Sequence, residues 1–295
     1  MAGGEAMTLQ AMFGPYPNTA ALKQGEVRSP LVSFSFADVK VANTFFKALV
    51  REQRFDVSEL AIVTYLQAKV YGKPYVLMPA VVVSRGQHHT IAYNAERGPL
   101  GPADLPGRRV GVRAYTQTTG AWVRGILADD YGVDVDRVRW VTFEDPHLAE
   151  YRDPPVVERA PEGKNLVQML LDGELDAAIV GDGGLPDPRL KHLFPDPDGA
   201  AQKWAARHGG IPINHMAVIR ESISKSRPDV VREVFRLLVE SQKRGTDRSG
   251  AIRFGFDAVK PSLELIIDYA VRQKLIPRRF AVDELFDDTT RALSA

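Results

Sequence analysis

Short apolar runs alternate with segments of helical spacing along most of the chain. Apolar runs bounded by turn residues are typical of buried strands, and they predict strands over Leu9–Phe13, Leu31–Phe36, Ser58–Val63, Val76–Ser84, Val110–Arg113, Val138–Phe143, Asp176–Val180 and His215–Arg220. Apolar residues at helical spacing predict helices over Thr19–Lys23, Val41–Glu52, Thr64–Val70, Gln117–Tyr131, Leu166–Leu171, residues 198–208, Asp229–Lys243 and Ser262–Lys274. This alternation indicates an α/β protein whose parallel strands are joined by helices.

The order of these elements predicts two lobes. One α/β unit runs to about residue 85, a second occupies about 105–205, and the last third returns to the first unit. We therefore expect residues 1–88 and 212–295 to form a discontinuous first lobe and residues 89–211 to form the second. Two crossings between lobes follow, near 85–95 and 209–217, as in proteins that close on a ligand about a hinge.

Composition narrows the classes of partner. Lys and Arg total 38 against 37 Asp and Glu, so no global field attracts nucleic acid or an anionic membrane, and neither partner is expected. The chain has no cysteine, which excludes disulfides, a thiol nucleophile and Cys-ligated metal. No apolar stretch approaches the ~18 residues of a membrane span. Residues 1–8 lack the pattern of a signal peptide, so a cytoplasmic location is expected.

The first candidate for chemistry is the loop that opens the helix at Gln117–Tyr131, namely Tyr115, Thr116, Gln117, Thr118 and Thr119. Free N–H groups at a helix N-terminus bind carboxylate or phosphate. The loop also follows the carboxyl end of a strand, where open α/β sheets bind ligands. The alternative is ordinary N-capping by threonine.

Histidines and an arginine mark the two expected crossings. If residues 85–89 continue as a strand, Arg85 and His89 share one face and His88 lies on the other, which argues against a paired-histidine metal site. Arg85 is then placed to bind a carboxylate, and the alternative is a solvated surface pair. His215 lies in an apolar strand at the second crossing. There it either transfers protons near neutral pH or is a packed core residue.

Two acidic positions complete the candidates. Glu59 is a possible acid–base or orienting group, whereas Asp56 better fits a structural cap. Asp182 lies in a Gly-rich loop after a strand and either contacts ligand or belongs to a simple turn. That loop lacks the glycine phasing and following helix of a dinucleotide site, and no phosphate-loop lysine motif appears, so no cofactor and no metal are expected.

Several segments together resemble the 4,5-dihydroxyphthalate decarboxylase family. They are the stretches at residues 14–25, 55–66, 84–90, 105–112, 122–125, 173–177 and 212–215, of which Phe55-Asp56-Val57-Ser58-Glu59-Leu60 is the most specific. The resemblance implies a two-lobed type 2 periplasmic-binding-protein-like fold with two hinge crossings. It also implies cofactor-independent decarboxylation of a hydroxylated aromatic acid between the lobes. Tyr16, Thr19 and Tyr65 then join the expected substrate-binding residues.

Two loops depart from the family pattern. The family usually has an acidic residue and an Arg where Pro15, Pro17 and Asn18 stand, and Pro-Glu where Arg113 and Ala114 stand. We expect His215 or His89 to transfer the proton, with Arg85 and the Thr116–Thr119 loop holding carboxylate. Two alternatives remain open: a solute-binding protein of an importer for a small carboxylate, and an enzyme of the same fold acting on another small acid. A homo-oligomer also remains open.

Overall fold

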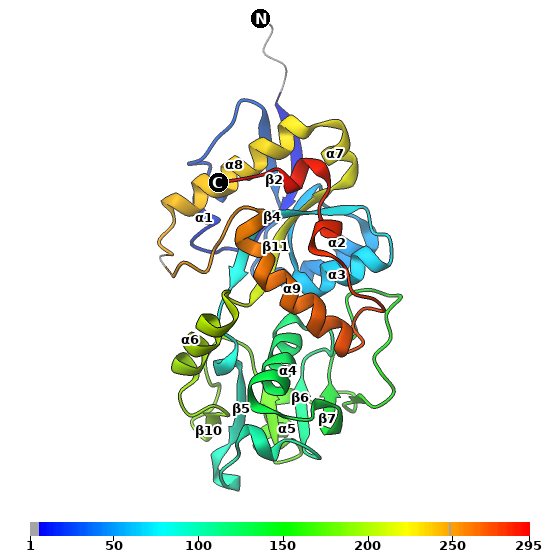
Figure 1. Cartoon of the computed structure of the whole chain (residues 1–295), viewed down its shortest axis with the longest axis vertical. Helices are drawn as coiled ribbons and strands as arrows, with labels where there is room; N and C mark the ends of the chain where they lie inside the picture. The colour runs from blue at the N-terminus through cyan, green and yellow to red at the C-terminus, as the bar shows by residue number, and fades with distance from the viewer. Residues whose placement is uncertain (1–5, 248) are drawn as a thin grey trace, which may run out of the picture.

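The computed structural model describes residues 6–247 and 249–295, in which two β-sheets follow one another along the long axis (Figure 1). The first sheet has the strand order β2-β1-β3-β11-β4. Its strands are β1 (Met7–Met12), β2 (Val32–Phe36), β3 (Val57–Ala61), β4 (Tyr75–Ser84) and β11 (Ile213–Arg220). The second sheet has the order β10-β5-β9-β6-β7-β8. Its strands are β5 (Ile91–Asn94), β6 (Arg109–Val112), β7 (Arg139–Thr142), β8 (Glu158–Arg159), β9 (Ala177–Ile179) and β10 (Leu190–His192).

We call the parts built on these sheets the first and second lobes. The α-helices of the described residues are α1 (Ala20–Lys23), α2 (Phe46–Glu52), α3 (Ile62–Val70), α4 (Thr118–Tyr131), α5 (Leu166–Leu171), α6 (Pro197–His208), α7 (Glu221–Ser226), α8 (Pro228–Arg244), α9 (Phe256–Arg272) and α10 (Asp288–Arg291). Short 3-10 helices lie at residues 42–45, 88–90, 95–97, 102–104, 135–137 and 282–285. The expected strands and helices are present with shifted ends, whereas β5, β8, β10, α7 and α10 had no clear pattern.

Antiparallel pairs depart from the expected parallel arrangement. Strands β1, β2 and β3 are parallel, but β11 runs antiparallel to β3 and β4, and β5 runs antiparallel to β9 and β10. Both β5 and β11 are the first strands that the chain enters after passing from the other lobe. Such a strand starts at the edge where the parallel strands end, so it runs against them.

The parity expected for residues 85–89 is wrong. Strand β4 ends at Ser84, and residues 88–90 form a 3-10 helix instead of a strand. At this turn α6 packs closely against Gly86, where an added Cβ would stand 2.6 Å from the Cβ of Ala201. His88 is buried against the ring of Phe194, and His89 is half-buried.

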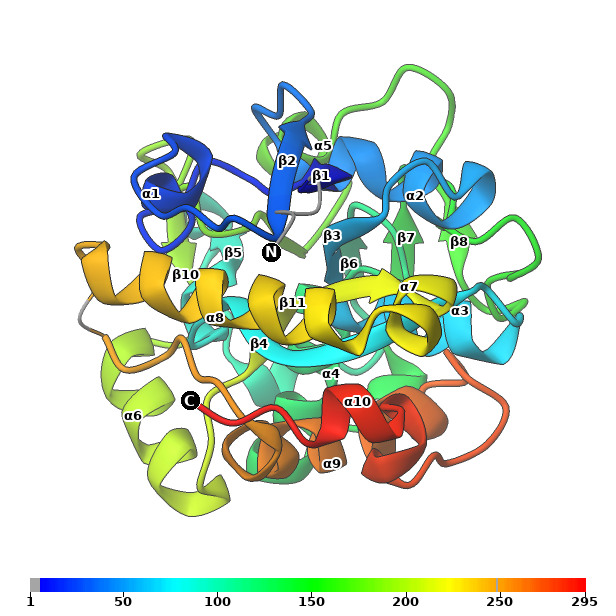
Figure 2. The same cartoon turned by 90° about the horizontal axis from the view of Figure 1, so that it is seen from above.

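Helices of the first lobe cover its sheet. Helices α7 and α8 pack on the sheet that holds β4 and β11 (Figure 2). Apolar residues at helical spacing turn one face of α8 into this core: Val230, Val231, Val234, Phe235, Leu237 and Leu238. Within the described part of the chain, no helix is both long and apolar enough to span a membrane.

Helix α9 connects the lobes, descending from the first lobe onto α4 of the second (Figure 1). Tyr269 of α9 packs edge-on against Trp122, with ring centroids 5.6 Å apart. Gly125 permits this approach, because a Cβ there would lie 2.0 Å from the Tyr269 ring. Just beyond α9, Gln273 accepts a 2.6 Å hydrogen bond from buried Arg124.

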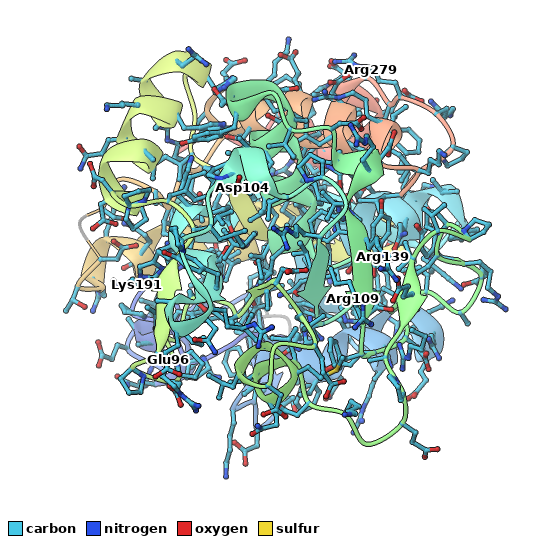
Figure 3. The ribbon with its side chains drawn as sticks, turned by 90° about the horizontal axis from the view of Figure 1, so that it is seen from below. Glu96, Asp104, Arg109, Arg139, Lys191 and Arg279 are labelled. Atoms are coloured by element: carbon cyan, nitrogen blue, oxygen red, sulfur yellow. The ribbon has the colours of Figure 1, made fainter. Side chains whose placement is uncertain are left out.

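The far end of the second lobe is strongly charged. Arg109 and Arg139 lie beside one another on this face (Figure 3), and both guanidinium groups contact Glu158 of β8 at distances of 2.8–3.1 Å. These pairs tie the short edge strand β8 to its neighbours. The charges lie at the opposite end of the lobe from the interlobe surface, so they do not contribute to a site between the lobes.

Candidate active site

A cleft of about 250 Å³ lies between the lobes, beside both chain crossings. The first lobe lines it with Tyr16, Val41, Ala42, Asn43, Phe46, Ala61, Thr64 and His215. The crossings and the second lobe line it with Arg85, Arg113, Thr116, Gln117, Thr118, Thr119, His147 and Asn214. A larger cavity of about 760 Å³ lies between α4 and α6, but none of the predicted site residues lines it. We therefore take the interlobe cleft as the candidate site.

A buried carboxylate supports the histidine of the first lobe. Glu59 on β3 is fully buried, and its Oε2 lies 2.6 Å from Nδ1 of His215 on β11. The strand register explains this pairing, because His215 lies opposite Ala61 and Glu59 lies opposite Ala217, so the two side chains are diagonal neighbours on one face. The Glu59 carboxylate therefore fixes the ring orientation and leaves Nε2 of His215 to exchange protons.

Two further donors complete the surroundings of Glu59. The backbone N–H of Gly14 donates to Oε1, and the Tyr16 hydroxyl donates to Oε2 over 3.2 Å. Burial, together with the neighbouring Glu59 carboxylate, raises the pKa of Tyr16, so its hydroxyl stays protonated and remains a donor. Three donors thus stabilise a carboxylate that has no access to solvent.

Two helix N-termini meet at the cleft, one from each lobe. Thr118 at the start of α4 accepts a 3.2 Å hydrogen bond from the N–H of Val63 in α3, and Thr119 accepts a 3.3 Å bond from Asn214. Gln117 is the N-cap of α4 but makes no capping hydrogen bond through its side chain. The helix dipole makes both ends favourable for anions, although the Val63 N–H of α3 already donates to Thr118.

Two arginines add positive charge to the cleft wall. Arg85 follows β4 and lies 3.2 Å from Asp182, which is half-exposed at the mouth. Burial lowers the pKa of Arg85, although its guanidinium remains a cation at neutral pH. Arg113 follows β6 and is paired with Glu144 at 2.7 Å. Arg113 occupies one of the positions that differ from the family pattern, and it lines the cleft.

Sequence reasoning missed His147, which lies in the long loop after β7. Its Nδ1 lies 2.8 Å from the hydroxyl of Thr64, and its backbone carbonyl accepts a 2.7 Å hydrogen bond from Arg51. Burial and the nearby Arg113, Lys47 and His215 lower the pKa of His147 to about 3. The loop's position after the carboxyl end of a strand was the one signal that favoured a functional role.

Several predicted residues do not line the cleft. Tyr65 is buried on the inner side of α3 and donates to the carbonyl of Leu285, so its placement at the ligand was wrong. Thr19 donates to the carbonyl of Gly14 and shapes the loop that carries Tyr16. These two side chains support the cleft wall without reaching its surface.

The other three lie around the cleft. The Tyr115 ring packs on the Arg124 guanidinium, 4.1 Å from ring centroid to Cζ. Asp182 contacts the cleft through Arg85. His89 lies in the 3-10 helix of the first crossing, and burial followed by the Arg85 charge lowers its pKa. Among the described residues, no three His, Asp or Glu side chains gather so as to hold a metal ion.

Solved structures share this architecture. The alkanesulfonate-binding protein SsuA from Xanthomonas axonopodis pv. citri, bound to MOPS, has a TM-score of 0.62 and 14% identity, covering 96% of this chain and 99% of its own. SsuA from Escherichia coli has a TM-score of 0.59 and 11% identity, covering 98% and 94%. The desulfurization enzyme DSZB has a TM-score of 0.52 and 13% identity, covering 96% and 97%. These similarities confirm the type 2 periplasmic-binding-protein-like fold.

Curated relatives show the family. No protein-family model matches the sequence. A 4,5-dihydroxyphthalate decarboxylase from Comamonas testosteroni is 32% identical over 236 residues, which cover 75% of this chain and 71% of the relative. A 4,5-dihydroxyphthalate decarboxylase from Pseudomonas putida is 34% identical over 212 residues, which cover 67% and 81%. On this similarity, the chain belongs to the 4,5-dihydroxyphthalate decarboxylase family.

Proposed function

We propose that this protein decarboxylates a hydroxylated phthalate-type acid, such as 4,5-dihydroxyphthalate, in the interlobe cleft without an organic cofactor. Two relatives that cover most of the chain are named for this reaction. The observation that carries the proposal is the Glu59–His215 pair, which faces a cleft lined by two arginines and two helix N-termini. A proton-transfer group and anion-binding groups thus meet at one place.

The cleft suits a substrate with two carboxylates. Arg85 and Arg113 supply two separate guanidinium groups, each able to hold a carboxylate through paired hydrogen bonds. The N-terminus of α4, which has no side-chain capping hydrogen bond from Gln117, adds backbone donors. One carboxylate stays bound while the other leaves as CO2. A cleft with two anion-binding arginines therefore matches a substrate that begins with two carboxylates.

The chemistry needs a proton at a ring carbon. When the hydroxyl para to the leaving carboxylate is ionised, its charge reaches the ring carbon that bears this carboxylate. That carbon takes a proton, the carbon–carboxylate bond breaks, and its electron pair returns to the ring and the oxygen as CO2 departs. In this proposal Nε2 of His215 gives the proton, since Nδ1 is held by Glu59. Positioned acid–base catalysis of this kind contributes ~10²–10⁴-fold.

Incubating the purified protein with 4,5-dihydroxyphthalate tests the proposal. We expect release of CO2 and formation of protocatechuate in equal amounts, measured by chromatography and CO2 trapping. His215→Ala should bind substrate but lower kcat by ~10²-fold or more, because the proton donor is lost. A wild-type protein that binds the compound and releases no CO2 would contradict the proposal.

The likeness to SsuA favours a second candidate, a solute-binding protein for a small anion. That function requires binding and domain closure without turnover. The contacts of α9 with α4, including the Arg124–Gln273 hydrogen bond, connect the lobes and favour a cleft of fixed width. Scattering measurements with and without phthalate distinguish the two: a large compaction without CO2 release supports the binding protein.

A further inference from the structure

His147 is a second imidazole in the cleft, and the chemistry proposed above gives it no role. It enters from the opposite lobe to His215, on the loop that follows β7. Both imidazole rings meet the ring of Phe46 edge-on, with centroid distances of 5.5 Å for His147 and 5.2 Å for His215. Two imidazoles therefore line the cleft at separate points, with an apolar ring in contact with both.

We propose that His147 is a second catalytic residue, a neutral imidazole whose Nε2–H donates a hydrogen bond to the phenolic oxygen of the bound substrate. This inference rests on the proposed decarboxylation and assigns the place of the hydroxylated end of the ring. A phenolic oxygen para to the reacting carbon lies across the ring from it, so one imidazole cannot serve both atoms. His215 serves the carbon and His147 the oxygen.

The partner of Nδ1 sets the tautomer of His147. The Thr64 hydroxyl is buried, and among the described residues His147 Nδ1 is its hydrogen-bond partner, at 2.8 Å. A buried hydroxyl needs an acceptor for its hydrogen, and Nδ1 provides one only when the ring proton is on Nε2. Nε2 makes no hydrogen bond within the described part of the chain, so its N–H is available to a ligand in the cleft.

The surroundings keep this imidazole uncharged. Lys47 and Arg51 face it from α2, Arg113 from the end of β6 and His215 from β11. Burial, followed by the positive charges of Arg113, Lys47 and Arg51 and by the neighbouring His215, lowers the pKa of His147 to about 3, so it is neutral at physiological pH. A neutral imidazole is a poor proton donor to carbon but a good hydrogen-bond donor to developing negative charge.

The atoms balance with this assignment. The phenolic proton leaves to solvent, and the oxygen remains as phenolate beside Nε2–H of His147. The ring carbon forms a bond to the proton from His215 Nε2, and the carbon–carboxylate bond then breaks. Its electron pair returns through the ring to the oxygen, CO2 leaves, and His215 regains a proton from solvent. No oxidant or reductant takes part.

The test follows the ionisation of a catechol bound in the cleft. Protocatechuate is added to wild-type, His147→Ala and His147→Gln proteins, and the long-wavelength absorbance of its catecholate is followed against pH. We expect the pKa of the bound catechol to rise by about one to two units in His147→Ala, because a hydrogen bond to a charged oxygen is lost. His147→Gln keeps an amide donor and should restore part of the shift. The value of kcat should fall by ~10²-fold in His147→Ala.

Control variants and measurements distinguish the proposed role of His147 from the proposed decarboxylase function. His88→Gln changes another buried histidine, one that lies outside the cleft, and should leave both readouts at wild-type values. Thermal melts exclude misfolded variants. Turnover by the wild type with an unchanged catechol pKa in His147→Ala overturns the role of His147 and leaves the decarboxylase intact. Absence of turnover by the wild type overturns the function itself.

Discussion

The two walls of the cleft differ in how their polar groups are arranged. On the first-lobe wall, Glu59 is fully buried and receives hydrogen bonds from Gly14, Tyr16 and His215. On the second-lobe wall, Arg113 and the start of α4 present cationic or dipolar groups toward the cleft. The first wall is a closed network around one ionisable pair, whereas the second offers donors to a ligand.

This difference indicates that the two walls have different functions. Strands β3 and β11 hold the Glu59–His215 pair rigidly, because backbone hydrogen bonds to both neighbours fix β11 in the sheet. The opposite wall is built from a helix end and loops, which adapt more readily to the shape of an acid. A variant of Glu59 or His215 on the first wall should therefore change kcat, whereas a variant of the anion-binding Arg113 on the second wall should change binding.

The largest expected effect belongs to Glu59→Gln. Gly14 N–H, Tyr16 O–H and His215 Nδ1–H all donate to this carboxylate, but a glutamine has one acceptor oxygen and an NH2 that must itself donate. His215 then changes tautomer, and Nε2 no longer exchanges the required proton. We expect kcat to fall by ~10³-fold, measured by steady-state CO2 release.

Binding of protocatechuate provides the control for the Glu59→Gln variant. Titration calorimetry with protocatechuate should give a Kd within a few-fold of the wild-type value, because the carboxylate is shielded from the ligand. Glu240→Gln, on the exposed face of α8, should behave as wild type. A Glu59→Gln protein that turns over at the normal rate would contradict the assignment of proton transfer to the first wall.

Much of the fold follows from the sequence, because its strands and helices are strongly patterned. The pairing of residues at the candidate site does not follow from it. Glu59 and His215 were each singled out, yet they are 156 residues apart, and only the antiparallel register of β3 and β11 brings them together. Register depends on the whole sheet and leaves no local trace in the sequence.

His147, which the sequence did not single out, and Tyr65, which was expected at the cleft, have a related explanation. His147 lies in a Pro- and charge-rich loop without periodicity, and its place in the cleft comes from anchoring contacts such as Arg51 to its carbonyl. Tyr65 was expected at the cleft, but α3 is buried on all sides and turns this ring toward Leu285. Such positions depend on tertiary packing, which the pattern of one segment does not contain.

The charge state of His147, on the second-lobe wall, should make the stability of the protein depend on pH. Burial and neighbouring cations lower the pKa of His147 to about 3, from 6.5. Between pH 6.5 and pH 3, His147 is protonated in the unfolded chain but neutral in the folded protein. The free energy of unfolding therefore decreases as pH falls from 6.5 toward 3. Going from pH 7 to pH 5 should remove ~2 kcal/mol of unfolding free energy through this residue.

Urea unfolding at the two pH values measures this effect. In His147→Gln the loss of stability between pH 7 and pH 5 should be smaller than in the wild type by ~2 kcal/mol. Equal losses in both proteins would mean that His147 takes up a proton in the folded state. It would then be a cation, and the second wall would carry one more positive charge than the structure indicates.

The smallest expected effect is that of Arg113→Ala, and it tests the second wall most directly. Arg113 lines the cleft, but its guanidinium also forms an ion pair with Glu144. Its interaction with a bound carboxylate is therefore weaker than that of an unpaired arginine. Loss of a partly exposed charge contact with a carboxylate should raise KM by ~10-fold and leave kcat within about threefold, since His215 and Glu59 are untouched. Arg139→Ala, an arginine of the same lobe at its far end, should change neither constant. If Arg113→Ala instead lowers kcat and leaves KM unchanged, this guanidinium acts on the transition state and not on the binding of the substrate.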